Sequence, residues 1–173
     1  MTPEWGGDLG LERDIPVLWL GKPGSRRRRK LLRRVFASLQ SRGVKMMVVD
    51  GEQNPYVFGN ARTILLNRTR IVLNLLRQPT DENAGRFYIA SANGAMVVTE
   101  PLLPHHPVFT PGVHFVECPV ERMAETIDYY LHHEAERCQI ALRAHELVTT
   151  DMAIDKTVSA IIATVLARDP VLN

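Results

Sequence analysis

A dense run of basic side chains is the first feature of this sequence that could carry chemistry. The five residues 26–30 read RRRRK and follow directly on a short turn at 21–25. Backbone N–H groups at a helix start favour a phosphate, and an arginine can add two parallel charged hydrogen bonds. Arginines in a first turn otherwise oppose the helix dipole, and a bound anion would offset that conflict. We therefore expect Arg26 or Arg27 to contact a phosphate, with a solvated helix face as the alternative.

A second stretch of interest runs from Asp81 to Glu100. It begins with acidic residues, continues as a helix pattern and reaches a glycine stop at Gly94 before a strand pattern. Small residues at 90–92 would let the helix approach the sheet closely and bring its N-terminus near a ligand at the sheet edge. Ordinary packing explains these small residues equally well.

Several other kinds of site are disfavoured by the spacing of the residues. The histidines form adjacent pairs at 105–106 and 132–133, and neighbouring side chains diverge, so neither pair by itself makes a metal site. The turn at 21–25 matches neither the phosphate-binding GxxxxGK[ST] pattern nor GxGxxG, and there is no GxSxG nucleophile motif. We expect no bound metal. The missing motifs also argue against a kinase, an NAD-binding protein and a hydrolase.

The elements that position these residues follow from the hydrophobic pattern. Residues 14–20 form a short, mostly apolar run that is typical of a strand buried on both faces of a parallel sheet. Apolar residues from Leu31 to Leu39 recur at helical spacing, and Ser25 is available as the N-cap. A second strand is predicted at 44–49, after Gly43.

The rest of the chain continues the alternation and predicts the fold class. We expect a short helix at 61–67, a strand at 70–74, a helix at 83–93, and strands at 95–98 and 113–117. Alternating strands and helices with short connections indicate right-handed crossovers in an α/β, Rossmann-like, three-layer domain with a parallel sheet of about five strands. We expect one domain over 1–173, with a core at 12–150 and a C-terminal helix at 151–173.

From Pro119 onward the pattern is helical only, with three apolar stripes. The first stripe comprises Val120, Met123, Ala124, Ile127 and Leu131, the second Cys138, Ala141, Leu142, His145 and Val148, and the third Ile154, Val158, Ile161, Ile162 and Val165. The last helix is a candidate for packing against a partner domain.

Composition limits the cellular setting and the partners. The 173 residues are 45% hydrophobic, and two cysteines without ligand spacing are expected to be unpaired thiols. No apolar run is long enough for a transmembrane segment, and no signal peptide is recognisable, so a cytoplasmic protein is expected. Residues 1–76 carry 14 Lys/Arg and 6 Asp/Glu, whereas residues 77–173 carry 7 Lys/Arg and 13 Asp/Glu. The excess of basic residues in the first half would suit nucleic-acid binding. The sequence lacks the aromatic residues on which single-stranded bases stack and the known duplex-reading motifs, so nucleic acid is not the expected partner.

The order of these segments resembles the C-terminal domain of GT-B glycosyltransferases, especially the group 1 branch related to spore-maturation and spore-coat enzymes. The resemblance covers residues 12–150. It is carried by the strand, glycine and arginines of 14–27, the segments 70–74 and 86–94, the pair Pro111-Gly112, and the helical stretches 129–131 and 137–141.

The resemblance implies transfer of a sugar from a nucleoside diphosphate sugar without a tightly bound metal or other cofactor. Helix N-termini and basic side chains would stabilise the departing diphosphate. Seven binding positions are implied, namely Gly21, Arg26, Arg27, Asn74, Asp81, Asn83 and Arg86. Gly21 and one of the two adjacent arginines would approach the diphosphate, and Asn74 would lie beside the nucleotide unless its role is structural. Arg86, with the amides near Asn83, would face phosphate or sugar.

Two departures from the family pattern keep alternatives open. Many members carry a glutamate that binds the ribose hydroxyls at the position of Ile89, and an acidic residue eight positions earlier, where Asp81 stands. GT-B enzymes also place the acceptor site on an N-terminal domain, whereas the sheet here begins near residue 14. The acceptor domain is then a partner in trans or a lost portion of a longer chain, or the chain stands alone as a remnant. A non-catalytic α/β interaction module is the competing hypothesis.

Overall fold

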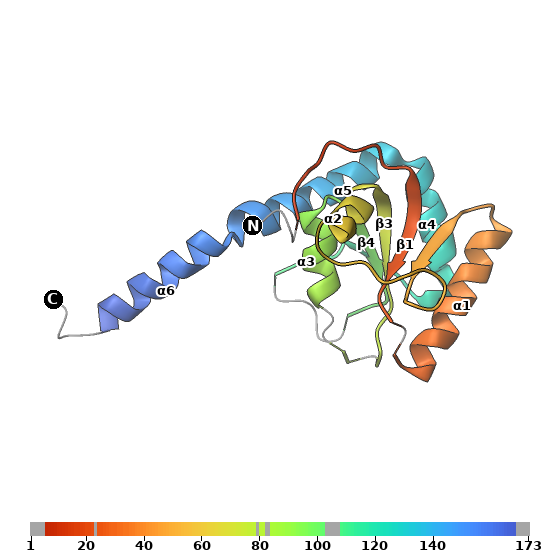
Figure 1. The fold of residues 1–173 in the computed structure, drawn as a ribbon, viewed down its shortest axis with the longest axis horizontal. Coiled ribbons are helices and arrows are strands. Elements are labelled where there is room, and N and C mark those ends of the chain that lie inside the picture. The colour runs from red at the N-terminus through yellow and green to blue at the C-terminus, as the bar shows by residue number, and fades with distance from the viewer. Residues whose placement is uncertain (1–5, 23, 79, 82–83, 103–107, 169–173) are drawn as a thin grey trace.

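The computed structural model describes residues 6–22, 24–78, 80–81, 84–102 and 108–168, and it confirms the α/β fold with helices on both faces of one sheet (Figure 1). The strands are β1 (Ile15–Leu20), β2 (Met46–Val49), β3 (Thr69–Asn74), β4 (Met96–Thr99) and β5 (Val116–Glu117). The helices are α1 (Arg26–Ser41), α2 (Gly59–Asn67), α3 (Ala84–Ala92), α4 (Met123–His132), α5 (Glu134–Glu146) and α6 (Ile154–Arg168). A 3-10 turn at Val120–Arg122 precedes α4, and a π-helical turn at Leu147–Asp151 follows α5.

The sheet is parallel throughout, with the strand order β2-β1-β3-β4-β5. The pairing register places Leu18 of β1 beside Met47 of β2 and Val72 of β3. Since parallel strands end at the same edge, the loops after β1, β2, β3 and β4 meet there, which is where ligands bind in open α/β sheets.

Buried side chains on both faces of the sheet explain why β1 reads as a continuous apolar run. Val17 and Trp19 enter the core beneath α1 and α4, while Leu18 enters the core beneath α2 and α3. Figure 1 shows α1 on one side of the sheet and α2 and α3 on the other. The α5 helix contributes to both cores, so the two layers are joined through it.

The start of α1 follows the predicted capping pattern. Ser25 is the N-cap, and its hydroxyl accepts a hydrogen bond from the Arg28 N–H at 3.1 Å. Leu32, Val35 and Leu39 then form the buried face. The cap fixes where the helix begins, and therefore the direction in which each arginine of the run points.

The fifth strand is shorter than the predicted 113–117. It contains only Val116 and Glu117, with an isolated bridge between Pro111 and Phe115. Gly112 has a φ of 75°, and the N–H groups of Val113 and His114 bond to the Thr110 carbonyl. This turn uses the backbone groups that a longer strand would have offered to β4.

The second C-terminal stripe is confirmed in part, because its members Ala141 and Val148 are buried. Cys138 and Leu142 are exposed, while Ile140 and Ala144 are buried with Arg137. The Arg137 guanidinium is held by Glu134 and lies 3.5 Å from the Arg70 carbonyl. A buried arginine is rare without such partners. Glu134 stands one helical turn before Arg137, whereas the Arg70 carbonyl is 67 positions away and could not be found from the helical spacing. Both cysteines are free, as expected.

The first stripe is confirmed in its centre and the third is solvent-facing. Met123, Ala124 and Ile127 of α4 are buried. In α6, the four described members Val158, Ile161, Ile162 and Val165 are exposed, and Figure 1 shows this helix extending away from the rest of the chain. Within the described residues, no helix has the length and apolarity needed to span a membrane.

Candidate functional site

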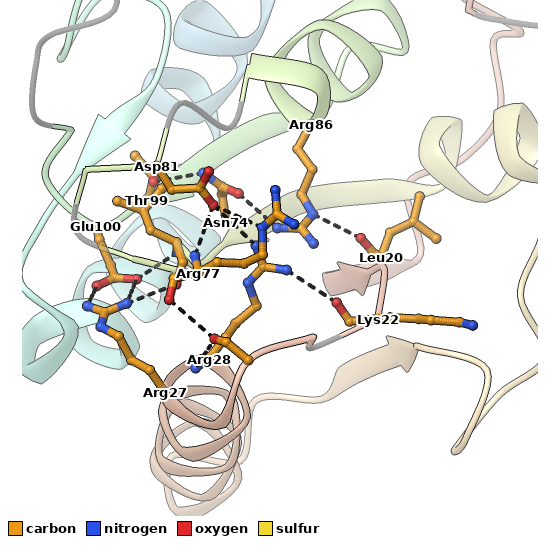
Figure 2. Close-up of polar contacts among 12 residues, drawn as sticks. Leu20, Lys22, Arg27, Arg28, Asn74, Arg77, Asp81, Arg86, Thr99 and Glu100 are labelled. Carbon is orange, nitrogen blue, oxygen red and sulfur yellow. Dashed lines mark hydrogen bonds and ion pairs between the residues drawn. The ribbon is translucent and has the colours of Figure 1, made fainter.

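A pocket of about 320 Å³ opens at the carboxyl-end edge of the sheet. Its walls come from the end of β1, the start of α1, the loop after β2, α2, the loop after β3, and α3. Four arginines line it, namely Arg28, Arg62, Arg77 and Arg86. Figure 2 shows the side chains of Arg28, Arg77 and Arg86 reaching toward the same space from three different segments.

Arg86 is partly buried and held by contacts to two strands and a ring. It donates through Nε to the Leu20 carbonyl and through Nη1 to Asn74 Oδ1, both at 3.0 Å. Its guanidinium lies 4.3 Å from the centre of the Trp19 ring. Burial, with a further contribution from the nearby Arg28 charge, lowers the pKa of Arg86 to about 10. The group is therefore still charged at neutral pH, but its charge is poorly compensated.

Gly21 makes room for Arg86. A Cβ atom at this position would lie 2.8 Å from Arg86 Nη2, and the glycine has a φ of 129° that other residues rarely adopt. Gly21 also accepts a hydrogen bond from the Trp19 indole at 2.6 Å. The predicted glycine thus lines the pocket, and it allows the closest approach of the arginine to the strand end.

Arg28 is buried beside it, with 5% of its surface exposed. Its Nη1 donates to the Lys22 carbonyl at 3.2 Å, and its Nη2 lies 3.8 Å from the Asp81 carboxylate. The Nε atom is buried without a hydrogen-bond partner. Burial and the neighbouring Arg77 charge lower the pKa of the Arg28 guanidinium. Arg28 thus retains an unused donor next to the pocket.

Asp81 is the acidic residue that balances part of this charge. Its Oδ2 accepts from the backbone N–H and the Nε of Arg77, each at 3.2 Å. Burial opposes ionisation of the carboxyl, but the hydrogen bonds from Arg77 and the charges of Arg77 and Arg28 outweigh it and lower the pKa of Asp81. One carboxylate therefore serves two arginines and leaves Arg86 without an ion pair among the described residues.

The two arginines predicted to contact phosphate are not part of the pocket lining. Arg26 is exposed, and Arg27 turns toward the buried Glu100, with which it forms an ion pair. Arg27 also donates to the Leu76 carbonyl at 2.9 Å, while Glu100 accepts from the Leu76 N–H at 2.8 Å. The hydrogen bond to Glu100 raises the pKa of Arg27. The member of the run that reaches the pocket is Arg28.

Asn74 lies behind the pocket wall. It is fully buried, donates to the Thr99 hydroxyl at 3.0 Å and accepts from Arg86. This arrangement is compatible with the structural alternative, because Asn74 helps to orient the side chain of Arg86. Asn83 lies outside the described residues.

Several lining residues were missed in the sequence. Arg77 lies in the loop after β3, at the predicted ligand edge, so its position in the sequence was a usable signal. Arg62 lies on α2, and no sequence signal pointed to it. Tyr56 lies in the loop after β2, which meets the same sheet edge, so its position was a usable signal as well. Ile89 lines the pocket as well, at the place where the family resemblance implied a glutamate.

The electrostatics of the pocket suit an anion with several oxygens. Planar guanidinium groups bind phosphate through paired, charged hydrogen bonds. Among the residues that the structure describes, no three His, Cys, Asp or Glu side chains gather in a way that could hold a metal ion. The charged groups of the described pocket lining are the four arginines and Lys22.

Comparison with known proteins gives two kinds of match. Residues 26–163 match a family model described as glycosyl transferase-like. A search of curated proteins found no match.

Solved structures match in fold. TarM aligns with a TM-score of 0.63 and 9% identity over 92% of this chain and 37% of its own. A TarM variant from S. aureus was solved in complex with fondaparinux, α-GlcNAc-glycerol and UDP. It aligns with a TM-score of 0.64 and 11% identity over 90% of this chain and 37% of its own. The C-terminal domain of the group 1 glycosyl transferase LpcC from Francisella tularensis aligns with a TM-score of 0.59 and 12% identity over 88% of this chain and 94% of its own. The chain thus spans little more than a third of the length of TarM.

Proposed function

The chain belongs to the glycosyl transferase-like family, and on that basis we propose that it is the donor-binding domain of a GT-B glycosyltransferase. In this proposal the pocket binds a nucleoside diphosphate sugar, and the chain works with an acceptor domain supplied in trans or by a further part of a longer chain. The diphosphate lies against Arg28, Arg77 and Arg86, where the sheet edge and the start of α1 meet.

The observation that carries the proposal is the uncompensated charge of Arg86. A buried cation without a counter-ion is costly, and the cost falls when an anion supplies the missing hydrogen bonds. Within the part of the chain that the structure describes, Arg86 bonds to the neutral oxygens of Leu20 and Asn74, while the nearby carboxylate of Asp81 is engaged by Arg77 and Arg28. A diphosphate brings the negative charge that this cluster lacks.

The same cluster suits the chemistry of sugar transfer. When the bond from sugar to diphosphate breaks, negative charge grows on the departing phosphate, and fixed cations stabilise it most at that moment. Arg86 is already held in place by Leu20, Asn74 and the Trp19 ring, so little reorganisation is needed. The UDP complex of a structural neighbour supports the nucleotide part of the proposal.

A non-catalytic interaction module remains the second candidate, and Ile89 is the observation that favours it. Its aliphatic side chain lines the pocket and cannot accept a hydrogen bond from a ribose hydroxyl. A domain that had lost donor binding could keep the fold and present other surfaces to a partner.

Calorimetric titration of the purified chain with UDP, GDP and their sugar conjugates at fixed moderate salt tests the proposal. We expect saturable binding that depends on the base. Arg77→Ala should weaken it about tenfold, or ~1.5 kcal/mol, because it removes a charged hydrogen-bond donor. Arg26→Ala is the matched control: it removes the same charge from the exposed side of the helix start and should leave the affinity within about twofold.

The two variants also identify a false positive. Equal weakening by Arg77→Ala and Arg26→Ala, together with indifference to the base, would indicate general attraction of anions to the basic half of the chain. A folded sample that binds none of the nucleotides would favour the interaction module.

A further inference from the structure

One wall of the pocket differs in chemistry from the arginine cluster. Arg28 and Lys22 reach it from the α1 side, whereas Leu66 of α2 and Ile89 and Ala90 of α3 come from the opposite layer. Leu66 and Ala90 belong to the hydrophobic core beneath α2 and α3. Two cations also come from that layer, Arg62 of α2 and Arg86 of α3. The pocket therefore combines a strongly basic part with an apolar wall, which suits a ligand with an anionic end and a flat, weakly polar end.

An aromatic pair stands where the apolar wall meets solvent. The Tyr56 ring lines the pocket and its centroid lies 4.8 Å from that of Phe58, with the ring planes tilted by 47°. Tyr56 is 38% exposed and Phe58 is 69% exposed. Phe58 immediately precedes α2, so one member of the pair is anchored at a helix start. Large aromatic surface left in water beside a pocket is typical of a site that a ligand covers.

We propose that Tyr56 is a substrate-binding residue whose ring stacks on the nucleobase of the bound nucleotide, with Phe58 packed against that ring. This rests on the proposed function, in which the diphosphate lies at the arginines. Stacking on an aromatic ring is favourable for any base because every base has a flat π face. Selectivity among bases would then come from groups around the ring and not from the stack.

The absence of a carboxylate increases the share of affinity that the ring must supply. Among the described residues that line the pocket, none is Asp or Glu. The ribose hydroxyls therefore find no charged acceptor in this part of the wall, and Ile89 offers only apolar contact. Affinity for a nucleoside diphosphate then comes from two separable sources, the arginines for the diphosphate and Tyr56 for the base.

The test compares UDP with inorganic pyrophosphate as titrants of the wild-type chain and of Tyr56→Ala and Tyr56→Phe. Tyr56→Ala should weaken UDP binding about tenfold and leave pyrophosphate binding within about twofold, because only UDP has a base to stack. Tyr56→Phe keeps the ring and should keep the UDP affinity. Tyr129→Ala is the matched control, since Tyr129 is a similarly exposed tyrosine, 46% exposed, on α4.

The outcomes distinguish this inference from the function on which it rests. If the wild-type chain binds both titrants but Tyr56→Ala weakens both equally, or neither, the stacking role is wrong and the donor site stands. If Tyr56→Phe loses UDP affinity like Tyr56→Ala, the hydroxyl and not the ring is responsible, and the stacking role is again wrong. If the folded wild-type chain binds neither UDP nor pyrophosphate, both proposals fall.

Discussion

At the scale of single residues, neighbouring arginines in one run have different tasks. Arg27 and Arg28 are adjacent, yet Arg27 pairs with Glu100 on one side and Arg28 enters the pocket on the other. A helix turns by about 100° per residue, so consecutive side chains must diverge. Glu100 is buried at the end of β4 and has 5% of its surface exposed, so its negative charge depends on Arg27 and on the Leu76 N–H.

Arg27→Ala should therefore destabilise the fold while sparing the pocket. Its removal leaves the buried Glu100 carboxylate without its cation, which we expect to cost ~1.5–3 kcal/mol of unfolding free energy because the lost hydrogen bonds are charged. Urea denaturation at neutral pH measures this loss, and nucleotide titration should show an affinity within about twofold of wild type.

The charge of Glu100 provides the control for that prediction. Adding Glu100→Gln to Arg27→Ala removes the unpaired charge and should recover part of the stability, because a neutral amide is less costly to bury. A loss of nucleotide affinity in Arg27→Ala as large as in Arg77→Ala would instead place Arg27 among the ligand contacts.

How much of the site could be predicted from the sequence depends on how far along the chain the hydrogen-bond partners of each side chain lie. The sheet edge, Gly21 and Arg86 were predicted and line the pocket. The choice between Arg27 and Arg28 depends on Glu100, 73 positions away from Arg27. No local pattern contains that partner. Asn74 follows the predicted strand at the edge, but only the structure shows that its side chain bonds to Arg86 and Thr99.

At the scale of elements, the hydrophobic pattern predicted helices and strands best where the same alternation recurs along the chain. The alternation of strands and helices fixed the order of β1 to β4, because buried parallel strands and amphipathic helices have different periods. The short β5 and the buried face of α5 were predicted less well. Arg137 lies on that face because Glu134 and the Arg70 carbonyl hold its guanidinium, and a charge inside an apolar stripe cannot be anticipated without those partners.

The cap of α1 joins local structure to the site, and it leads to an element-scale prediction. The Ser25 hydroxyl accepts from the Arg28 N–H and donates to the Arg77 carbonyl at 3.2 Å. Ser25→Ala removes both bonds and should lower the unfolding free energy by about 1 kcal/mol, as for other N-caps. It should also weaken pyrophosphate binding, because the segments that carry Arg28 and Arg77 lose their link.

Ser38→Ala is a suitable comparison within the same helix. It also removes a serine hydroxyl from α1, but in the last turn of the helix and away from the N-cap and the pocket. Circular dichroism melts and pyrophosphate titrations of the two variants should separate the cap from a general effect of serine removal. Equal pyrophosphate affinity in Ser25→Ala and wild type would show that the cap supports the helix alone.

At the scale of the whole molecule, α6 differs from every other helix described. Its described apolar residues Val158, Ile161, Ile162 and Val165 are between 47% and 58% exposed, and the helix extends away from the sheet (Figure 1). The preceding π-helical turn is different, because Val148 is only 3% exposed and belongs to the core beneath α2 and α3. The boundary between the packed domain and the projecting helix thus lies between Val148 and Ile154.

Two truncations test where the cooperative domain ends. A chain ending at Met152 lacks α6 and should keep the urea m-value and midpoint within about 10%, because m follows the surface that unfolding exposes. A chain ending at Glu146 also loses Val148, Leu147 and Met152 from the core beneath α2 and α3, and should be destabilised by at least ~1.5–3 kcal/mol, the value of one buried aliphatic side chain. If the chain ending at Met152 already shows a smaller m and a lower midpoint, α6 buries its apolar stripe against the domain in solution. In that case the stripe is part of the core and is no candidate surface for a partner domain.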